Sequence, residues 1–158
     1  MPLICDMSSD IFSRAVPVKK FAYIYAGAQK NLGPAGATVA ILREDMLERI
    51  PSTLPAYLSY KNHVENDSLY NTPPVFAIWT IKLVLERMKK LGGLAAVADH
   101  NARKAAVLYE AITNSGGFYR CPVDPQYRSD MNVVFRLPSE DLEKKFVKEA
   151  EALGMIGL

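Results

Sequence analysis

The feature that most restricts the fold is a loop rich in glycine and proline between two apolar segments. Residues 21–26 (FAYIYA) and 38–42 (TVAIL) are rich in β-branched or aromatic side chains, which predicts two buried strands. Residues 27–36 between them contain three glycines and one proline, so they are too irregular for a helix or strand. Residues 3–5 form another apolar run that ends at Asp6 and predicts a further buried strand.

Helices are predicted in the middle and at the end of the chain. The sequence Thr72-Pro73-Pro74 indicates a helix start, with a capping hydroxyl followed by proline at the first helical position. Gly92 and Gly93 separate this helix from the next. The predicted elements are a short helix at 44–49, a loop at 51–70, helices from 72 to about 91 and from 94 to about 114, a strand at 132–137, and a helix capped by Ser139 that ends near Gly154.

Composition narrows the class of protein. Hydrophobic residues make up 49% and charged residues 23%, values typical of a globular chain. The net charge of +2 comes with no basic stripe, so we expect neither nucleic acid nor a membrane surface as a partner. Two lone cysteines, no apolar run of about 20 residues and no signal-peptide pattern predict a cytoplasmic protein. Both ends of the sequence are apolar, which predicts a segment of a longer protein.

Two residues at predicted strand ends could carry chemistry. Lys30 lies in the loop between two strands, where partial desolvation favours the neutral amine that Schiff-base chemistry requires. Asp6 directly follows a strand, where a carboxylate can face a ligand and pair with the ring nitrogen of a pyridoxal cofactor. Each residue alone also has a simpler interpretation, as a solvated surface lysine and as a turn-initiating aspartate.

The remaining polar patterns are less informative. Asn71-Thr72 at a helix start is equally consistent with a plain helix cap and with a phosphate-binding N-terminus. Residues 33–36 (GPAG) fit neither a Walker loop nor a dinucleotide fingerprint, so nucleotide binding is rejected. His63 and His100 have no metal-ligand spacing around them, so we expect no metal site.

Several segments taken in order resemble one family. The chain is similar to the phosphoserine aminotransferases, which depend on pyridoxal phosphate and have the aspartate-aminotransferase fold type. The resemblance runs over nearly the whole chain. Its most specific segments are residues 24–31 and 70–74. The matching segments are 6–9 (DMSS), 24–31 (IYAGAQKN), 33–36 (GPAG), 70–74 (YNTPP), 116–119 (GGFY), 128–129 (RS), 131–133 (MNV) and Phe135.

The resemblance implies an α/β chain with part of a pyridoxal-phosphate transferase fold. Residues 1–100 would be the C-terminal part of the large cofactor-binding domain, and residues 101–158 an incomplete small C-terminal domain. Lys30 would hold pyridoxal 5′-phosphate covalently and move the proton between the substrate α-carbon and the cofactor. Asp6 would pair with the ring nitrogen and Gln29 would lie in the cofactor site. Asn71 and Thr72 would reach across a homodimer to the phosphate of the neighbouring cofactor.

The implied reaction moves an amino group between phosphoserine with 2-oxoglutarate and 3-phosphohydroxypyruvate with glutamate, in serine biosynthesis. Family members are much longer, so this chain would lack the substrate arginines and most of the pocket. We therefore expect it to be inactive alone. Two alternatives stay open. One is another aminotransferase or a cysteine desulfurase of the same fold type. The other is a non-catalytic module whose apolar strands associate with another chain.

Overall fold

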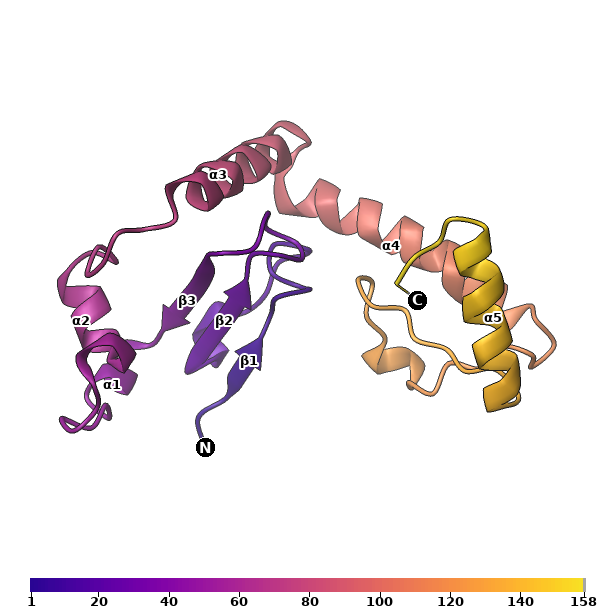
Figure 1. Cartoon of the computed structure of the whole chain (residues 1–158), viewed down its shortest axis with the longest axis horizontal. Helices are drawn as coiled ribbons and strands as arrows, with labels where there is room; N and C mark the ends of the chain where they lie inside the picture. The colour runs from indigo at the N-terminus through magenta and orange to yellow at the C-terminus, as the bar shows by residue number, and fades with distance from the viewer. Residues whose placement is uncertain (158) are drawn as a thin grey trace. The chain divides into compact units, whose positions relative to one another are not determined.

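The computed structural model describes residues 1–157, which form two compact units (Figure 1). The first unit is Met1–Ala98 and the second begins at Asp99. Strands lie only in the first unit, among the described residues, and helices occur in both. Within residues 1–157, no helix is long and apolar enough to cross a membrane.

A three-stranded sheet forms the centre of the first unit (Figure 1). Its strands are β1 (Ile4–Asp6), β2 (Tyr23–Gly27) and β3 (Thr38–Leu42), in that order. β1 is parallel to β2, whereas β3 is antiparallel to it. The three strands predicted within residues 3–42 are confirmed, and β3 has the predicted bounds. β1 and β2 begin slightly later than predicted, because their first paired residues are Ile4 and Tyr23.

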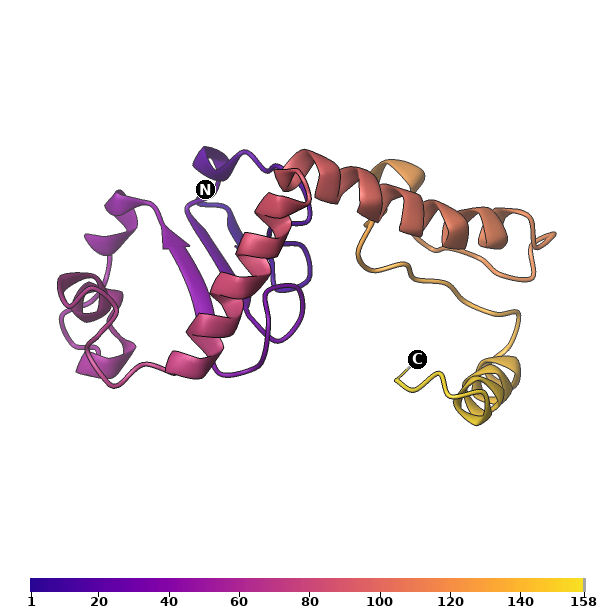
Figure 2. The same ribbon diagram turned by 90° about the horizontal axis from the view of Figure 1, so that it is seen from above.

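The two faces of the sheet differ in burial. Ile24 and Ala26 of β2 are fully buried, while Tyr23 and Tyr25 alternate with them and are half-buried on the opposite face. Helix α3 (Val75–Lys90) covers the buried face, with Ile81 and Leu85 packed against the core (Figure 2). The core residues are Met7, Ile11, Ile24, Ala26, Ala28 and Leu32. The other face is therefore the one that carries the polar side chains of β1 and β2.

The predicted start of α3 is wrong. Thr72 does not cap the helix, which begins at Val75 with Pro74 as its N-cap and has no side-chain cap bond. A proline disfavours the helical conformation of the residue before it, so Pro74 keeps Pro73 out of the helix. Trp79 lies on α3 and is 53% exposed, and its ring centroid lies 6.0 Å from that of Phe76.

The predicted loop at residues 51–70 is also wrong in part. After α1 (Glu44–Leu47), the chain forms a short 3-10 helix, η2 (Ala56–Leu58), and then α2 (Tyr60–Glu65). Polar side chains stabilise these turns: Asn62 Nδ2 donates to Ala56 O at 2.6 Å, and His63 Nε2 lies 3.0 Å from Tyr57 O. Helices held by such polar contacts need no regular spacing of apolar residues. A prediction based on that spacing therefore missed η2 and α2.

The second unit contains most of α4 (Gly93–Thr113), the 3-10 helix η3 (Pro125–Tyr127) and α5 (Glu140–Ala152). The helix predicted after Ser139 is confirmed, since Ser139 Oγ accepts from Leu142 N at 3.3 Å. Its predicted end is confirmed as well: Gly154 has a φ of 86°, and its N–H donates to Glu151 O at 2.9 Å.

The strand predicted at residues 132–137 is not formed. This segment makes a single antiparallel bridge, between Arg120 and Arg136. Arg120 N donates to Arg136 O at 3.0 Å, and Arg136 N donates back at 2.8 Å. Two residues after Arg120 the partner segment reaches Pro122, which has no N–H to donate. The ladder therefore does not extend beyond one residue pair.

Candidate functional site

The carboxyl ends of β1 and β2 bring Asp6 and Lys30 to the same edge of the sheet. Asp6 is the last residue of β1, and it pairs with Tyr25 two residues before the end of β2. Lys30 lies in the turn that follows Gly27, the last residue of β2. The positive charge of Lys30 is the smallest of the causes that lower the pKa of Asp6. In open α/β sheets this edge is where ligands bind.

Ser8 holds the Asp6 carboxylate in place. Its hydroxyl donates to Asp6 Oδ1 at 2.6 Å, and its backbone N–H donates to the same oxygen at 2.8 Å. The Ser8 hydroxyl also accepts a bond from Gly27 N at 3.0 Å, so it links the ends of the two strands. Ser8 is 7% exposed, which makes it a buried polar group whose donor and acceptor are both used.

Sequence reasoning did not assign Ser8 a role, although a signal was present. An aspartate whose side chain accepts from the backbone two residues later is an Asx turn, and the Asp6-x-Ser8 spacing is compatible with one. The second bond of Ser8, to Gly27, could not be foreseen. It depends on the parallel pairing of two strands that are far apart in the sequence.

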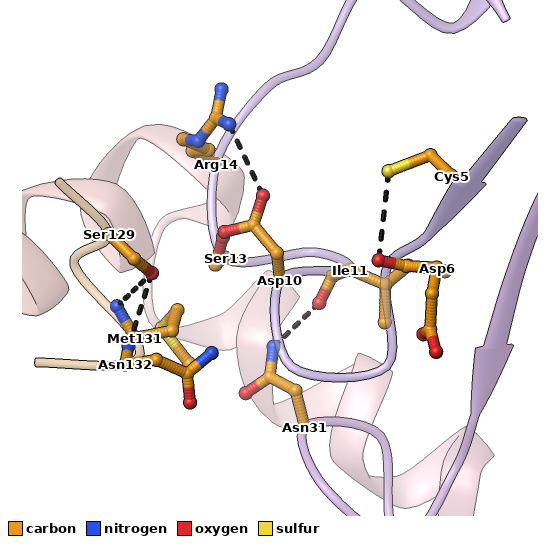
Figure 3. Close-up of polar contacts among 10 residues, drawn as sticks. All are labelled: Cys5, Asp6, Asp10, Ile11, Ser13, Arg14, Asn31, Ser129, Met131 and Asn132. Atoms are coloured by element: carbon orange, nitrogen blue, oxygen red, sulfur yellow. Dashed lines mark hydrogen bonds and ion pairs between the residues drawn. The ribbon is translucent and has the colours of Figure 1, made fainter. Parts of the chain in front are cut away.

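Asn31 anchors the turn that carries Lys30. Its side-chain Nδ2 donates to Ile11 O at 2.6 Å, a contact between the loop after β2 and the loop after β1 (Figure 3). Leu32 is fully buried, and Gly33 N donates to Ala28 O at 2.7 Å. Lys30 is therefore presented by a turn that is fixed on its C-terminal side by both packing and hydrogen bonds.

Gln29 lies close to the end of β2. A Cβ placed on Gly27 would be 2.5 Å from Gln29 Oε1, so the amide of Gln29 lies against the backbone of Gly27 and would have to move for a larger residue there. Gln29 and Lys30 are both solvent-exposed. The desolvation that the sequence argument expected around Lys30 is thus not provided by residues 1–157.

Asn71 and Thr72 are not part of this cluster. Both are exposed in the segment before α3, and Asn71 Nδ2 donates to Thr72 O at 3.2 Å. Among the described residues, no hydrogen bond or ion pair connects them to Asp6 or Lys30. Over the same residues, no group of three or more His, Cys, Asp or Glu side chains could hold a metal ion.

The hydrogen bonds at Asp6 determine its charge. The side-chain and backbone bonds from Ser8 hold the pKa of Asp6 below its usual range, with smaller contributions from the Tyr25 hydroxyl and the charge of Lys30. The charge of Asp6 in turn raises the pKa of Tyr25. Asp6 is therefore an anion throughout the neutral pH range, and Tyr25 stays protonated. An exposed carboxylate that is ionised at neutral pH, at the same sheet edge as a lysine, is suited to a ligand with both a cationic ring and a carbonyl.

Replacing Ser8 with alanine is expected to raise the pKa of Asp6 toward its ordinary value, because the largest stabilising contact of the carboxylate is lost. The folded-state pKa of Asp6 lies below the unfolded value. Ionised Asp6 thus stabilises the fold above the unfolded pKa, and this contribution disappears as pH falls through the folded pKa. Stability in the variant should therefore fall less steeply with acid.

Carbon-13 NMR titration of the Asp6 carboxyl would measure this shift. Ser9→Ala is the matched control, since Ser9 makes none of the bonds to Asp6. An Asp6 titration that is identical in Ser8→Ala and Ser9→Ala would contradict the assigned role of Ser8.

Comparison with known proteins gives consistent matches. Residues 1–156 match the family model for aminotransferase class-V. Over 156 residues the chain is 58% identical to the phosphoserine aminotransferase of Geobacillus kaustophilus (strain HTA426). The match covers 99% of this chain and 43% of the relative. The chain thus spans less than half the length of the curated relatives it matches.

Solved structures match the fold. A phosphoserine aminotransferase from Bacillus circulans subsp. alkalophilus superposes with a TM-score of 0.92 at 54% identity, covering 100% of this chain and 44% of that one. A phosphoserine aminotransferase from Trichomonas vaginalis, solved with pyridoxal phosphate bound, superposes with a TM-score of 0.88 at 39% identity. That match covers 99% of this chain and 45% of the other. The described units therefore have the α/β fold of part of these enzymes.

Proposed function

Because the chain belongs to the class-V aminotransferase family, we propose that it supplies the cofactor lysine and its carboxylate partner to a phosphoserine aminotransferase. The family match confirms the resemblance drawn from the sequence. The reaction is proposed to be reversible amino transfer between phosphoserine with 2-oxoglutarate and 3-phosphohydroxypyruvate with glutamate, in serine biosynthesis. A phosphoserine aminotransferase that is 58% identical over 156 residues supports that choice over other substrates.

One observation carries the proposal: Asp6 ends β1 and Lys30 follows the end of the adjacent β2, while Ser8 is bonded to both strand ends. The donor set fits pyridoxal phosphate, which needs an amine for its aldehyde and a carboxylate for its ring nitrogen. Both Ser8 donors bind Asp6 Oδ1, so that oxygen is occupied by the loop. The side chain as a whole remains exposed and accessible to a ligand.

When bound, the cofactor supplies an electron-withdrawing ring that stabilises negative charge on the substrate α-carbon. Asp6, held as an anion by Ser8, would keep the ring nitrogen of the cofactor protonated. Lys30 would hold the cofactor through Nζ and would act as the base that moves the proton of the substrate α-carbon. Gln29, whose amide lies against Gly27, would lie in the cofactor site.

The proposal extends to the assembly. Asn71 and Thr72 lie apart from the Asp6–Lys30 cluster, and we propose that they bind the phosphate of the neighbouring cofactor in a homodimer. Residues 1–100 would then be the C-terminal part of the large domain and residues 101–158 part of the small one. Two free cysteines, Cys5 and Cys121, support a cytoplasmic location. The chain alone is proposed to be inactive, since it spans 43% of its relative.

Borohydride trapping tests the proposal in a full-length protein. The test protein is the Geobacillus kaustophilus relative with its matched segment replaced by this chain, referred to below as the chimera. It would be incubated with pyridoxal phosphate, reduced, digested and mapped by mass spectrometry. We expect stoichiometric labelling of Lys30 over all other lysines, and amino transfer from phosphoserine. Random labelling would overturn the assignment of Lys30.

The same treatment of the 158-residue chain by itself tests the alternative of a non-catalytic association module. A stable oligomer that takes up no cofactor and is unchanged by Lys30→Ala would favour the non-catalytic association module. Labelling of Lys30 in the chain without amino transfer would support a cofactor site that needs the rest of the protein for catalysis.

A further inference from the structure

Tyr25 lies directly beside Asp6 on the neighbouring strand. The two residues are register partners in the parallel pair β1–β2, so their side chains project from the same face of the sheet. The Tyr25 hydroxyl lowers the pKa of Asp6, and the charge of Asp6 raises the pKa of Tyr25. Asp6 thus has two donors from its own loop, both on Ser8, and the Tyr25 side chain beside it on the neighbouring strand.

Two further tyrosines fix the ring of Tyr25. The ring centroids of Tyr25 and Tyr23 are 5.5 Å apart, and those of Tyr23 and Tyr60 are also 5.5 Å apart in an edge-to-face arrangement. The hydroxyls of Tyr23 and Tyr60 form a short hydrogen bond with each other. Tyr25, Tyr23 and Tyr60, called the tyrosine row below, connect the end of β1 to helix α2.

A carboxylate in this position needs more than one support. β1 is only three residues long and lies at the edge of the sheet, and Asp6 is its exposed last residue. Both bonds from Ser8 go to the same oxygen, Oδ1, and both come from one residue of the adjoining loop. A carboxylate oxygen can accept more than one bond, so a donor on the neighbouring strand can hold the carboxylate from a second direction.

We propose that Tyr25 is a positioning residue for the cofactor site: its hydroxyl orients the Asp6 carboxylate toward the ring nitrogen, and the tyrosine row holds Tyr25 in place. This inference rests on the proposed function, since it assigns Asp6 a cofactor to face. Tyr25 acts through Asp6 and does not touch the reacting atoms. Its loss therefore weakens cofactor binding without removing the chemistry of Lys30.

The test is Tyr25→Phe in the chimera, which deletes one hydroxyl and keeps the ring. The dissociation constant for pyridoxal phosphate is expected to rise about 10-fold, as for one hydrogen bond to a charged group. In the cofactor-free protein, the Asp6 carboxyl should titrate at higher pH, because a donor to the ionised form is gone. The added loss should vanish in an Asp6→Ala background, since Tyr25 then has no carboxylate to orient.

Tyr57→Phe is the matched control, because Tyr57 is 61% exposed and lies outside the tyrosine row. A purely structural role would lower stability in Tyr25→Phe while leaving the Asp6 titration unchanged, and that result would overturn the inference. A failure of this inference can be told apart from a failure of the proposed function. If Lys30 is labelled in the chimera but Tyr25→Phe changes neither affinity nor titration, only the inference fails. If Lys30 is not labelled, the Asp6 titration still decides whether Tyr25 orients the carboxylate.

Discussion

Lys30→Ala in the chimera is expected to lower kcat/KM for phosphoserine about 10⁴-fold, the upper range for loss of a general acid–base group. The variant loses both the amine that holds the cofactor and the group that carries the proton from the α-carbon. Residues 1–157 contain no other lysine in the turn between β2 and β3 that could replace it. Steady-state kinetics, together with the loss of the absorbance of the bound cofactor, would measure the effect.

Lys20→Ala is the matched control for this experiment. Lys20 is an exposed lysine of the same unit in the 3-10 helix η1 (Val18–Lys20), before β2, and its removal should leave kcat/KM unchanged. Lys30→Arg tests whether charge alone suffices. It keeps a cation near Asp6 but cannot form the covalent link at neutral pH, so it should be as inactive as Lys30→Ala. Activity within 10-fold of the parent in either Lys30 variant would rule out the assigned role.

Asp6→Asn is expected to lower kcat about 10²- to 10³-fold, similar to the loss of one group that stabilises charge in a transition state. The change is nearly isosteric, and the new amide oxygen can still accept the bonds from Ser8. What disappears is the negative charge that keeps the ring nitrogen protonated. The fold should therefore persist while the chemistry slows, and stopped-flow absorbance of the half-reaction with phosphoserine would show it.

Asp10→Asn gives the comparison for Asp6→Asn. Asp10 lies in the same loop, but its carboxylate bonds to Ser13 and Arg14 and not to the groups around Asp6. Its exposed ion pair with Arg14 is expected to contribute little to stability. Equal losses of rate in both variants would point to a general disturbance of the loop and would argue against a specific role for Asp6.

The strands of the first unit were predictable from the sequence because their signals are local. β3 has the bounds that its apolar run indicated. Asp6 and Lys30 drew attention through their positions beside such runs, and their roles, which the family resemblance suggested, stay predictions. Ser8 and Tyr25 were not predicted as supports of Asp6. Their contacts depend on which strand lies beside β1 and in which register, and no short segment contains that information.

Proline explains two of the wrong predictions. At Pro73-Pro74 the pattern of a capped helix start was present, but the second proline moved the start of α3 to Val75. At residues 132–137 the strand pattern itself was sound. The fault lies in the opposite segment, where Pro122 lacks the N–H that a longer ladder requires. A strand prediction made from one segment alone has no information on which N–H groups the partner segment can donate.

The exposure of Trp79 makes the chain its own optical probe. It is the single tryptophan of the sequence, and it lies on α3, whose other side packs against the core beside the Lys30 turn. An indole in water emits at longer wavelength than one that is covered. The emission maximum of the unlabelled chain should therefore move to the blue whenever a second polypeptide shields this side of α3, so assembly can be followed by fluorescence without any added dye.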